Sequence, residues 1–193
     1  MNKEKIYEKE LEYIKDDRVR ESCITMINLL PEYIFHEAAS STGKYHPKYA
    51  LGEGGLVRHT KAAVRFAHEL FEDPCIGEKY TDKEKDLIIM GLILHDGLKR
   101  GIKEEKYTRF DHPILMAEYI ELNKDKLSIS DKERELVCSV IKTHMGSWTT
   151  DYQGNEVLER PKTKQQNFVH MCDYLASRKA FLLEFDEDNN VIC

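Results

Sequence analysis

An apolar run in the middle of the chain constrains its fold more than any other feature. Residues 87–94 read LIIMGLIL, and Thr81 and Glu84 just before them have the spacing of a helix capping box. The pattern predicts a helix that is apolar nearly all round, and such a helix must lie at the centre of the molecule. It ends at His95 and Asp96. From composition alone, about 0.5 adjacent His-Asp pairs are expected in such a chain, so chance could produce one. The pair is informative only if other polar residues are buried with it.

The rest of the chain has the apolar spacing of helices, without a linker, repeat or low-complexity segment. Helices are expected over residues 3–16, 19–38 with an interruption at Pro31, 56–71, 81–95, 111–123, 131–145 and 163–183. Residues 39–55, 97–110 and 146–162 have the composition of connecting loops. We therefore expect one all-α domain over residues 1–193. It would be a compact bundle with N-terminal helices in 1–38, two long loops at 39–55 and 146–162, and a short acidic tail at 184–193, frayed or forming a small extension.

The composition is that of an ordinary soluble globular protein, with 41% apolar and 33% charged residues. The net charge of −6 argues against strong nonspecific binding to nucleic acid. The five cysteines are scattered and include no CxxC pair, which indicates reduced thiols. The first residues are charged throughout and the longest apolar run is too short to cross a bilayer, so we expect a cytoplasmic protein without a membrane partner.

Six polar residues are expected to face the interior from five of the predicted helices: His59, His95, Asp96, His112, His144 and Asp173. Any one of them could be a core histidine or carboxylate satisfied by a local hydrogen bond. Burying four imidazoles and two carboxylates together is unfavourable unless they pair or bind a cation. Imidazole nitrogen and carboxylate oxygen are common ligands of divalent transition metals, so a metal site is the simplest account.

Three segments of the chain carry a resemblance to a known family. GGLVRHT, LHDGLKRG and VHMCDYLASR place His59, His95-Asp96 and Asp173 in the order H…HD…D. Over residues 50–180 the chain resembles the HD superfamily of metal-dependent phosphohydrolases. The local wording is most similar to the HD domain of bacterial 3′–5′ exoribonucleases, although 193 residues do not accommodate their additional nucleic-acid-binding domain.

The resemblance implies a site with two divalent transition-metal ions, with Mn, Fe, Co, Ni and Zn as candidates. His59, His95, Asp96 and Asp173 would hold the first ion, and Asp96 would bridge to a second ion held by His112 and His144. Two ions about 3.5–4 Å apart can activate water for attack on phosphorus. The expected activity is that of a phosphodiesterase or phosphatase. Its partner would be a phosphate-containing small molecule or short oligonucleotide, namely a nucleotide, cyclic nucleotide or oligonucleotide.

Substrate residues are expected around this site. Lys99, one helical turn after the HD pair, is the first candidate for a phosphate contact and, with Asp96, for a catalytic role; Arg178 and Lys142 are further candidates. For each of these three cations the alternative is an ordinary solvated charge. In the loop 146–162, which should lie near the metals like the loop 39–55, Trp148 and Tyr152 could stack on a base or fix the loop to the body.

The remaining histidines are expected to matter less. His170 could support the site from a neighbouring helical face or be simply partly buried. His36, His46 and His68 are expected at the surface or in loops, with His46 a candidate for the mouth of the site.

Two other functions stay open at this point. Dinuclear HD proteins also include mixed-valent di-iron oxygenases, and the ligand set alone does not distinguish them from hydrolases. A non-catalytic nucleotide-binding or sensor module is the third possibility. The oligomeric state does not follow from the sequence.

Overall fold

The computed structural model describes the chain except for residues 1, 41–42, 44–45, 181–183 and 193. The elements are α1 (Lys3–Ile6), α2 (Glu8–Leu11), α3 (Asp17–Leu29), η1 (Glu32–Phe35), η2 (Lys48–Ala50), α4 (Gly55–Glu72), α5 (Pro74–Gly77), α6 (Asp82–Leu94), α7 (His112–Leu122), η3 (Lys124–Lys126), α8 (Asp131–Lys142), α9 (Lys164–Ala176), β1 (Glu184–Phe185) and β2 (Val191–Ile192). Here η denotes a short 3₁₀ helix. The predicted all-α class is confirmed, with one two-stranded antiparallel hairpin added in the described residues near the C-terminus.

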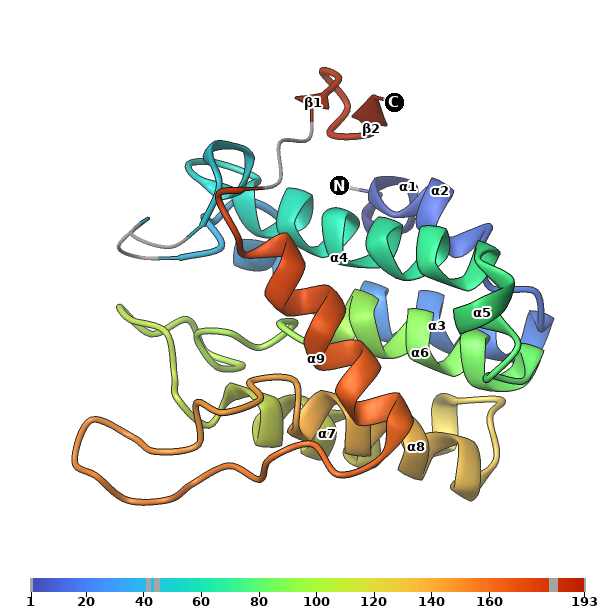
Figure 1. Ribbon diagram of the computed structural model, residues 1–193. Helices are drawn as coiled ribbons and strands as arrows, with labels where there is room; N and C mark the ends of the chain where they lie inside the picture. The colour runs from blue at the N-terminus through green and yellow to red at the C-terminus, as the bar shows by residue number, and fades with distance from the viewer. Residues whose placement is uncertain (1, 41–42, 44–45, 181–183, 193) are drawn as a thin grey trace.

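Helix α6 is the centre of the bundle, as its apolar run predicts. It packs against α3, α4, α8 and α9, and every large apolar side chain of residues 87–94 is at most 2% exposed. Figure 1 shows α9 crossing in front of α6, with α4 on one side and α8 on the other. Gly91 allows the close approach of α8, since a Cβ atom there would lie 2.7 Å from Cγ2 of Val140. The C-terminal end of α6 therefore delivers His95 and Asp96 to the middle of the molecule.

Three helices begin with capping boxes, in which a side chain and a backbone N–H bond reciprocally across the first turn. The pairs are Thr81 and Glu84 for α6, Ser130 and Glu133 for α8, and Thr163 and Gln166 for α9. The starts of these helices lie within two residues of the expected ones. Because α6, α8 and α9 carry or precede predicted ligands, these caps help to fix the register of the site.

The expected helix over 3–16 is wrong in its length. It is split into α1 and α2 at Tyr7, whose ring is 1% exposed and packs near Phe35, with 6.4 Å between ring centroids. The chain leaves the helical path after Leu11, and the backbone N–H groups of residues 15 and 16 donate to the buried Asp86 carboxylate at 2.9 and 2.8 Å. A partner about seventy residues away thus decides where this helix stops.

The expected helix over 163–183 is also too long, because α9 ends at Ala176. The Ser177 hydroxyl donates to the carbonyl of Tyr174 at 2.7 Å, and such a bond competes with helix continuation. Residues 181–183 lie outside the described part. The tail beyond them includes the hairpin β1–β2 rather than a frayed end. Its turn residue Asn189 bonds Arg58 of α4 at 2.6 Å (Nη1 to Oδ1).

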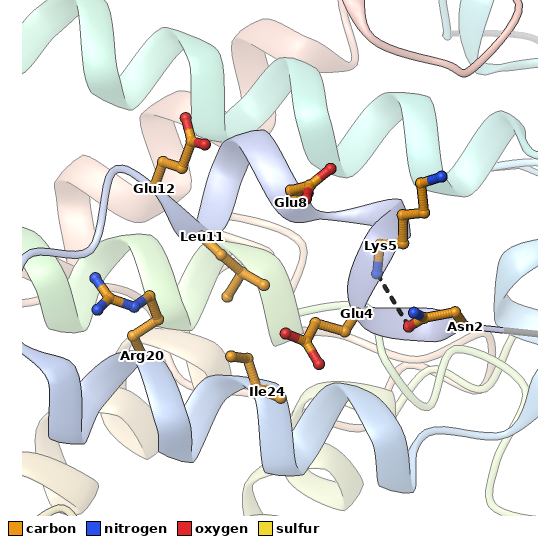
Figure 2. A pocket seen from close by; sticks show the side chains of 8 residues that line it. All are labelled: Asn2, Glu4, Lys5, Glu8, Leu11, Glu12, Arg20 and Ile24. Carbon is orange, nitrogen blue, oxygen red and sulfur yellow. Dashed lines mark hydrogen bonds between the residues drawn. The ribbon is translucent and has the colours of Figure 1, made fainter.

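A cavity of about 370 Å³ lies between the N-terminal helices and α3. Figure 2 shows its lining side chains: Asn2, Glu4, Lys5, Glu8, Leu11, Glu12, Arg20 and Ile24. None of the six predicted metal ligands lines it, so this cavity is separate from the predicted site. Among the helices of the described chain, none combines the length and the apolar character needed to traverse a lipid bilayer.

Candidate metal centre

The six predicted ligands converge from five segments of the bundle. His59 lies in the second turn of α4, His95 and Asp96 at the end of α6, His112 at the start of α7, and Asp173 in the last turns of α9. His144 was expected on a helical stripe, but α8 ends at Lys142, so His144 lies in the turn that follows. The turn still directs its imidazole inward, and His144 is 1% exposed.

One half of the cluster consists of His59, His95 and Asp173. Oδ1 of Asp173 lies 2.9 Å from Nε2 of His59 and 3.5 Å from Nε2 of His95. Two ligand atoms at about 2.1 Å from an ion and at right angles lie about 3.0 Å apart. The spacing of the three residues therefore suits one metal ion, and their ligand atoms all lie within 4.8 Å of one another.

The other half consists of Asp96, His112 and His144. Oδ1 of Asp96 lies 2.9 Å from Nε2 of His112 and 3.6 Å from Nε2 of His144, and the two imidazole nitrogens are 3.4 Å apart. Oδ2 of the same carboxylate faces His95, whose Nε2 is 3.6 Å away. Asp96 thus presents one oxygen to each half, which is the position needed for the predicted bridge. The bridge itself stays a prediction.

Three of the histidines are oriented by their own backbone. In each, Nδ1 donates to the carbonyl oxygen three residues earlier: Leu92 for His95 (2.6 Å), Arg109 for His112 (2.7 Å) and Ile141 for His144 (2.8 Å). A neutral imidazole that donates from Nδ1 carries its lone pair on Nε2. All three Nε2 atoms are the ones that face the carboxylates, so their lone pairs point into the cluster.

Several polar atoms of the cluster are buried without a hydrogen bond. In the described part of the chain these include Nε2 of His95, Oδ1 of Asp96 and Nδ1 of His59. A lone pair on Nε2 that faces a carboxylate oxygen repels it unless a cation or a proton lies between them. The donor set and its unsatisfied atoms therefore fit divalent metal ions.

The electrostatics of the cluster favour ionised carboxylates and a neutral His144. Burial works against protonation of His95, but Asp96 and Asp173 outweigh it and raise its pKa, so the two carboxylates attract a positive charge to this position. Burial lowers the pKa of His144 to about 3, and the neighbouring His95 adds to this effect, so His144 is neutral near pH 7. Burial works against ionisation of Asp96, but Lys99 and His95 outweigh it and hold its pKa well below the usual range. For Asp173 burial is likewise outweighed, here by His59 and His95.

The predicted phosphate contacts differ in how close they lie to the cluster. Lys99 is 12% exposed and its ammonium group contacts Oδ2 of Asp96, so it borders the predicted ligands directly. Arg178 lies beyond the end of α9, with its guanidinium 4.3 Å from the ring centroid of Tyr174. Lys142 is exposed at the end of α8, two residues before His144.

Trp148 lies at the start of the loop that follows His144. Its indole is 50% exposed and stacks on Tyr174, with 6.1 Å between ring centroids and 22° between ring planes. Tyr152 is 98% exposed. Tyr174 is not among the site residues predicted from the sequence. Its position directly after Asp173 is the one sequence signal that places it near the cluster.

His170 lies one turn before Asp173 and supports the His144 segment. Its Nδ1 lies 2.7 Å from the carbonyl oxygen of His144. Its ring also packs on Gly146, where φ is +65° and a Cβ atom would overlap three ring atoms. His170 thus fixes the turn that carries both His144 and Trp148.

Two further residues near the cluster are weakly indicated by the sequence, in the case of His46, or not indicated at all, in the case of Glu37. The ring of His46 lies 5.3 Å from that of His59. Among the residues described, its Nδ1 is buried without a hydrogen bond. Burial lowers the pKa of His46 to about 3, and the neighbouring His59 contributes to the same shift. Glu37 pairs with Arg100 at 2.5 Å, and burial raises its pKa to about 6. Both precede α4 in irregular chain, where the helical spacing gives no information on side-chain direction.

The other two histidines lie away from the cluster. His36 is exposed and pairs with Glu53 at 3.4 Å, and the ring of His68 stacks on that of Tyr13 with 4.0 Å between centroids. This agrees with the expectation that they are surface or loop residues.

The sequence model of the HD domain matches residues 56–178, a span that begins just before His59 and ends after Asp173. No curated protein and no solved structure gives a significant match. The matched span covers well over half of the chain and includes all six residues of the cluster. The chain therefore belongs to the HD domain family, a superfamily of metal-dependent hydrolases.

Proposed function

We propose that the protein is a metal-dependent phosphohydrolase that cleaves a phosphoester or phosphodiester of a nucleotide, cyclic nucleotide or short oligonucleotide. The observation that carries the proposal is that two adjoining sets of possible metal-ligating atoms lie next to one partly buried cation. Asp96 joins the two sets and Lys99 borders them. A phosphate needs both kinds of partner, because its charge must be neutralised while one of its oxygens leaves.

The position of each residue in the cluster would determine its role. His59, His95, Asp96 and Asp173 would hold one divalent ion, and Asp96, His112 and His144 a second. When bound, the ions would supply an activated water at neutral pH and positive charge for the phosphate oxygens. Lys99 would leave Asp96 and bind a phosphate oxygen, because a divalent ion compensates the carboxylate more strongly than an ammonium group does.

The side chains around the cluster favour hydrolysis that does not pass through a covalent enzyme intermediate. Cys172, next to Asp173, is fully buried, and burial raises the pKa of its thiol far above the physiological range. Such a thiol is not a nucleophile. Water would then be the nucleophile. The imidazoles of His95, His112 and His144, whose Nδ1 atoms bond backbone carbonyls, would act as ligands rather than as bases.

The test is turnover by the purified protein loaded with Mn²⁺, measured on a panel of phosphodiesters, cyclic nucleotides and short single-stranded oligonucleotides. We expect metal-dependent release of phosphate or nucleotide, abolished in Asp96→Ala. A matched control is Asp125→Ala, which removes an aspartate from the short helix η3, away from the cluster. A protein that binds nucleotides tightly without turnover, or an iron-only protein that consumes oxygen and is inert toward phosphodiesters, would refute the proposal.

A further inference from the structure

Three planar side chains form one stack beside the His/Asp cluster. The indole of Trp148 lies nearly parallel to the ring of Tyr174, and the guanidinium of Arg178 lies over the same ring at 4.3 Å. We call Trp148, Tyr174 and Arg178 the aromatic stack. Trp148 is 50% exposed and Tyr174 39%, so the stack keeps a large planar surface in water.

The aromatic stack is tied to the cluster through two segments. Tyr174 directly follows Asp173, and Trp148 is four residues after His144. His170 joins the segments, because its Nδ1 bonds the His144 carbonyl at 2.7 Å and its ring lies 6.0 Å from that of Tyr174. The stack is therefore held at a fixed place relative to two predicted ligands.

Anchoring of the loop does not account for this arrangement. An aromatic side chain that only fixes a loop contributes most to stability when its apolar surface is buried, yet half of the Trp148 surface stays exposed. The guanidinium of Arg178 is itself planar, so it adds positive charge next to the Tyr174 ring in a shape that also stacks. A planar apolar face combined with a cation, next to a site for a phosphate, matches a nucleobase linked to that phosphate.

We propose that the aromatic stack is a subsite for an unpaired nucleobase whose attached phosphate lies at the His/Asp cluster. The proposal rests on the proposed function and narrows it: the substrate is a single-stranded nucleotide or oligonucleotide. It is not a sugar phosphate, which has no base, nor a duplex, whose bases are already stacked on one another. Recognition by stacking is tolerant of base identity, because each base offers a planar π surface.

Trp148 is the single tryptophan of the chain, so its fluorescence reports directly on the stack. We would titrate the metal-free protein with a dinucleotide and with the matched dinucleotide in which one base is replaced by an abasic tetrahydrofuran. We expect saturable quenching by the first ligand and affinity lower by about 5- to 150-fold for the second, the range that stacking of one base provides. Tyr174→Ala should remove this difference and Tyr174→Phe should keep it.

The control variant is Tyr107→Ala, which removes another exposed tyrosine with a cation over its ring, Lys106 at 5.3 Å, from a different loop. It should bind both ligands as the unchanged protein does. Turnover with Mn²⁺ adds a second readout: Trp148→Ala should raise KM for the dinucleotide with little change in kcat, and Trp148→Phe should restore KM.

The outcomes separate the two proposals. Equal affinity for the two ligands, or an equal loss in Tyr107→Ala, overturns the subsite even if the protein hydrolyses phosphodiesters. Base-selective quenching without any turnover in the Mn²⁺-loaded protein supports the subsite and overturns the proposed function. Circular dichroism of each variant distinguishes loss of the stack from loss of the fold.

Discussion

Gly146→Ala tests whether the turn after α8 is held as the structure describes. Gly146 has φ of +65°, and an alanine in this left-handed region costs about 1–2 kcal/mol relative to glycine. Its Cβ would also overlap the ring of His170, which is half-buried and bonds the His144 carbonyl. Forcing this ring aside adds about 1–3 kcal/mol. We therefore expect a total loss of about 2–5 kcal/mol.

Gly154→Ala separates the two contributions. Gly154 lies in the same loop with φ of +88°, but an added Cβ meets nothing within 4 Å. This variant should lose only the backbone part, about 1–2 kcal/mol. Urea unfolding of both variants, followed by circular dichroism, gives the difference as the energy of the Gly146–His170 contact. A His170→Ala change in the Gly146→Ala background should recover part of the loss, because the obstructing ring is gone.

The two glycine variants should also differ in metal binding. Displacing His170 moves the His144 carbonyl and with it the imidazole, so Gly146→Ala should retain about one ion per chain where Gly154→Ala retains two. Metal analysis after dialysis measures this. If Gly146→Ala is no less stable than Gly154→Ala and keeps the same metal content, His170 does not position the turn and the reasoning fails.

The remaining predictions concern the cluster and one surface ion pair. Asp96→Ala should lose both ions, whereas His112→Ala should lose one; mass spectrometry of the dialysed proteins for metals checks this, and full occupancy in Asp96→Ala would contradict the bridge. Lys99→Met should lower kcat/KM by about a hundredfold without loss of metal, as removal of one charge-stabilising donor typically does, and unchanged kinetics would exclude Lys99 from the phosphate site. Contact with Lys83 lowers the pKa of Asp16 from 3.8 to about 2 in the folded protein. Its contribution to stability is thus complete above pH about 4 and is lost as the pH falls toward 2. The urea midpoint should drop over that range, and Lys83→Met should flatten the drop.

The central part of the fold follows from local sequence signals. Helix α6 combines a capping box, an apolar run and a terminal His-Asp pair, and all three lie within the sixteen residues from Thr81 to Asp96. The candidate ligands follow in the same way, because each lies on or beside a helix whose apolar spacing sets the inward face. Where such spacing exists, the sequence predicts both the element and the direction of its side chains.

The parts that were predicted incorrectly or left open depend on long-range or competing bonds, or on irregular chain. The N-terminal helix stops where backbone N–H groups find the carboxylate of Asp86, a partner in another helix. Helix α9 stops at the bond of Ser177 to its own preceding turn, although the apolar residues continue the helical pattern. The short hairpin near the C-terminus depends on Asp186, whose carboxylate accepts the N–H groups of residues 188 and 190. The position of His46 depends on an irregular loop, where no periodicity directs a side chain.

The bonds from Nδ1 of His95, His112 and His144 to carbonyls three residues earlier have a consequence for how the site tolerates change. Each of the three imidazoles is supported within its own turn of chain. For His95 and His112, ligand and support therefore move together as one short unit, whereas His144 also depends on His170, which bonds its carbonyl. Loops that leave the His170 contact in place can change in length and composition, and with them the molecules admitted, while the geometry offered to the metal ions stays the same. Selectivity and metal binding are in this sense encoded in separate stretches of the polypeptide.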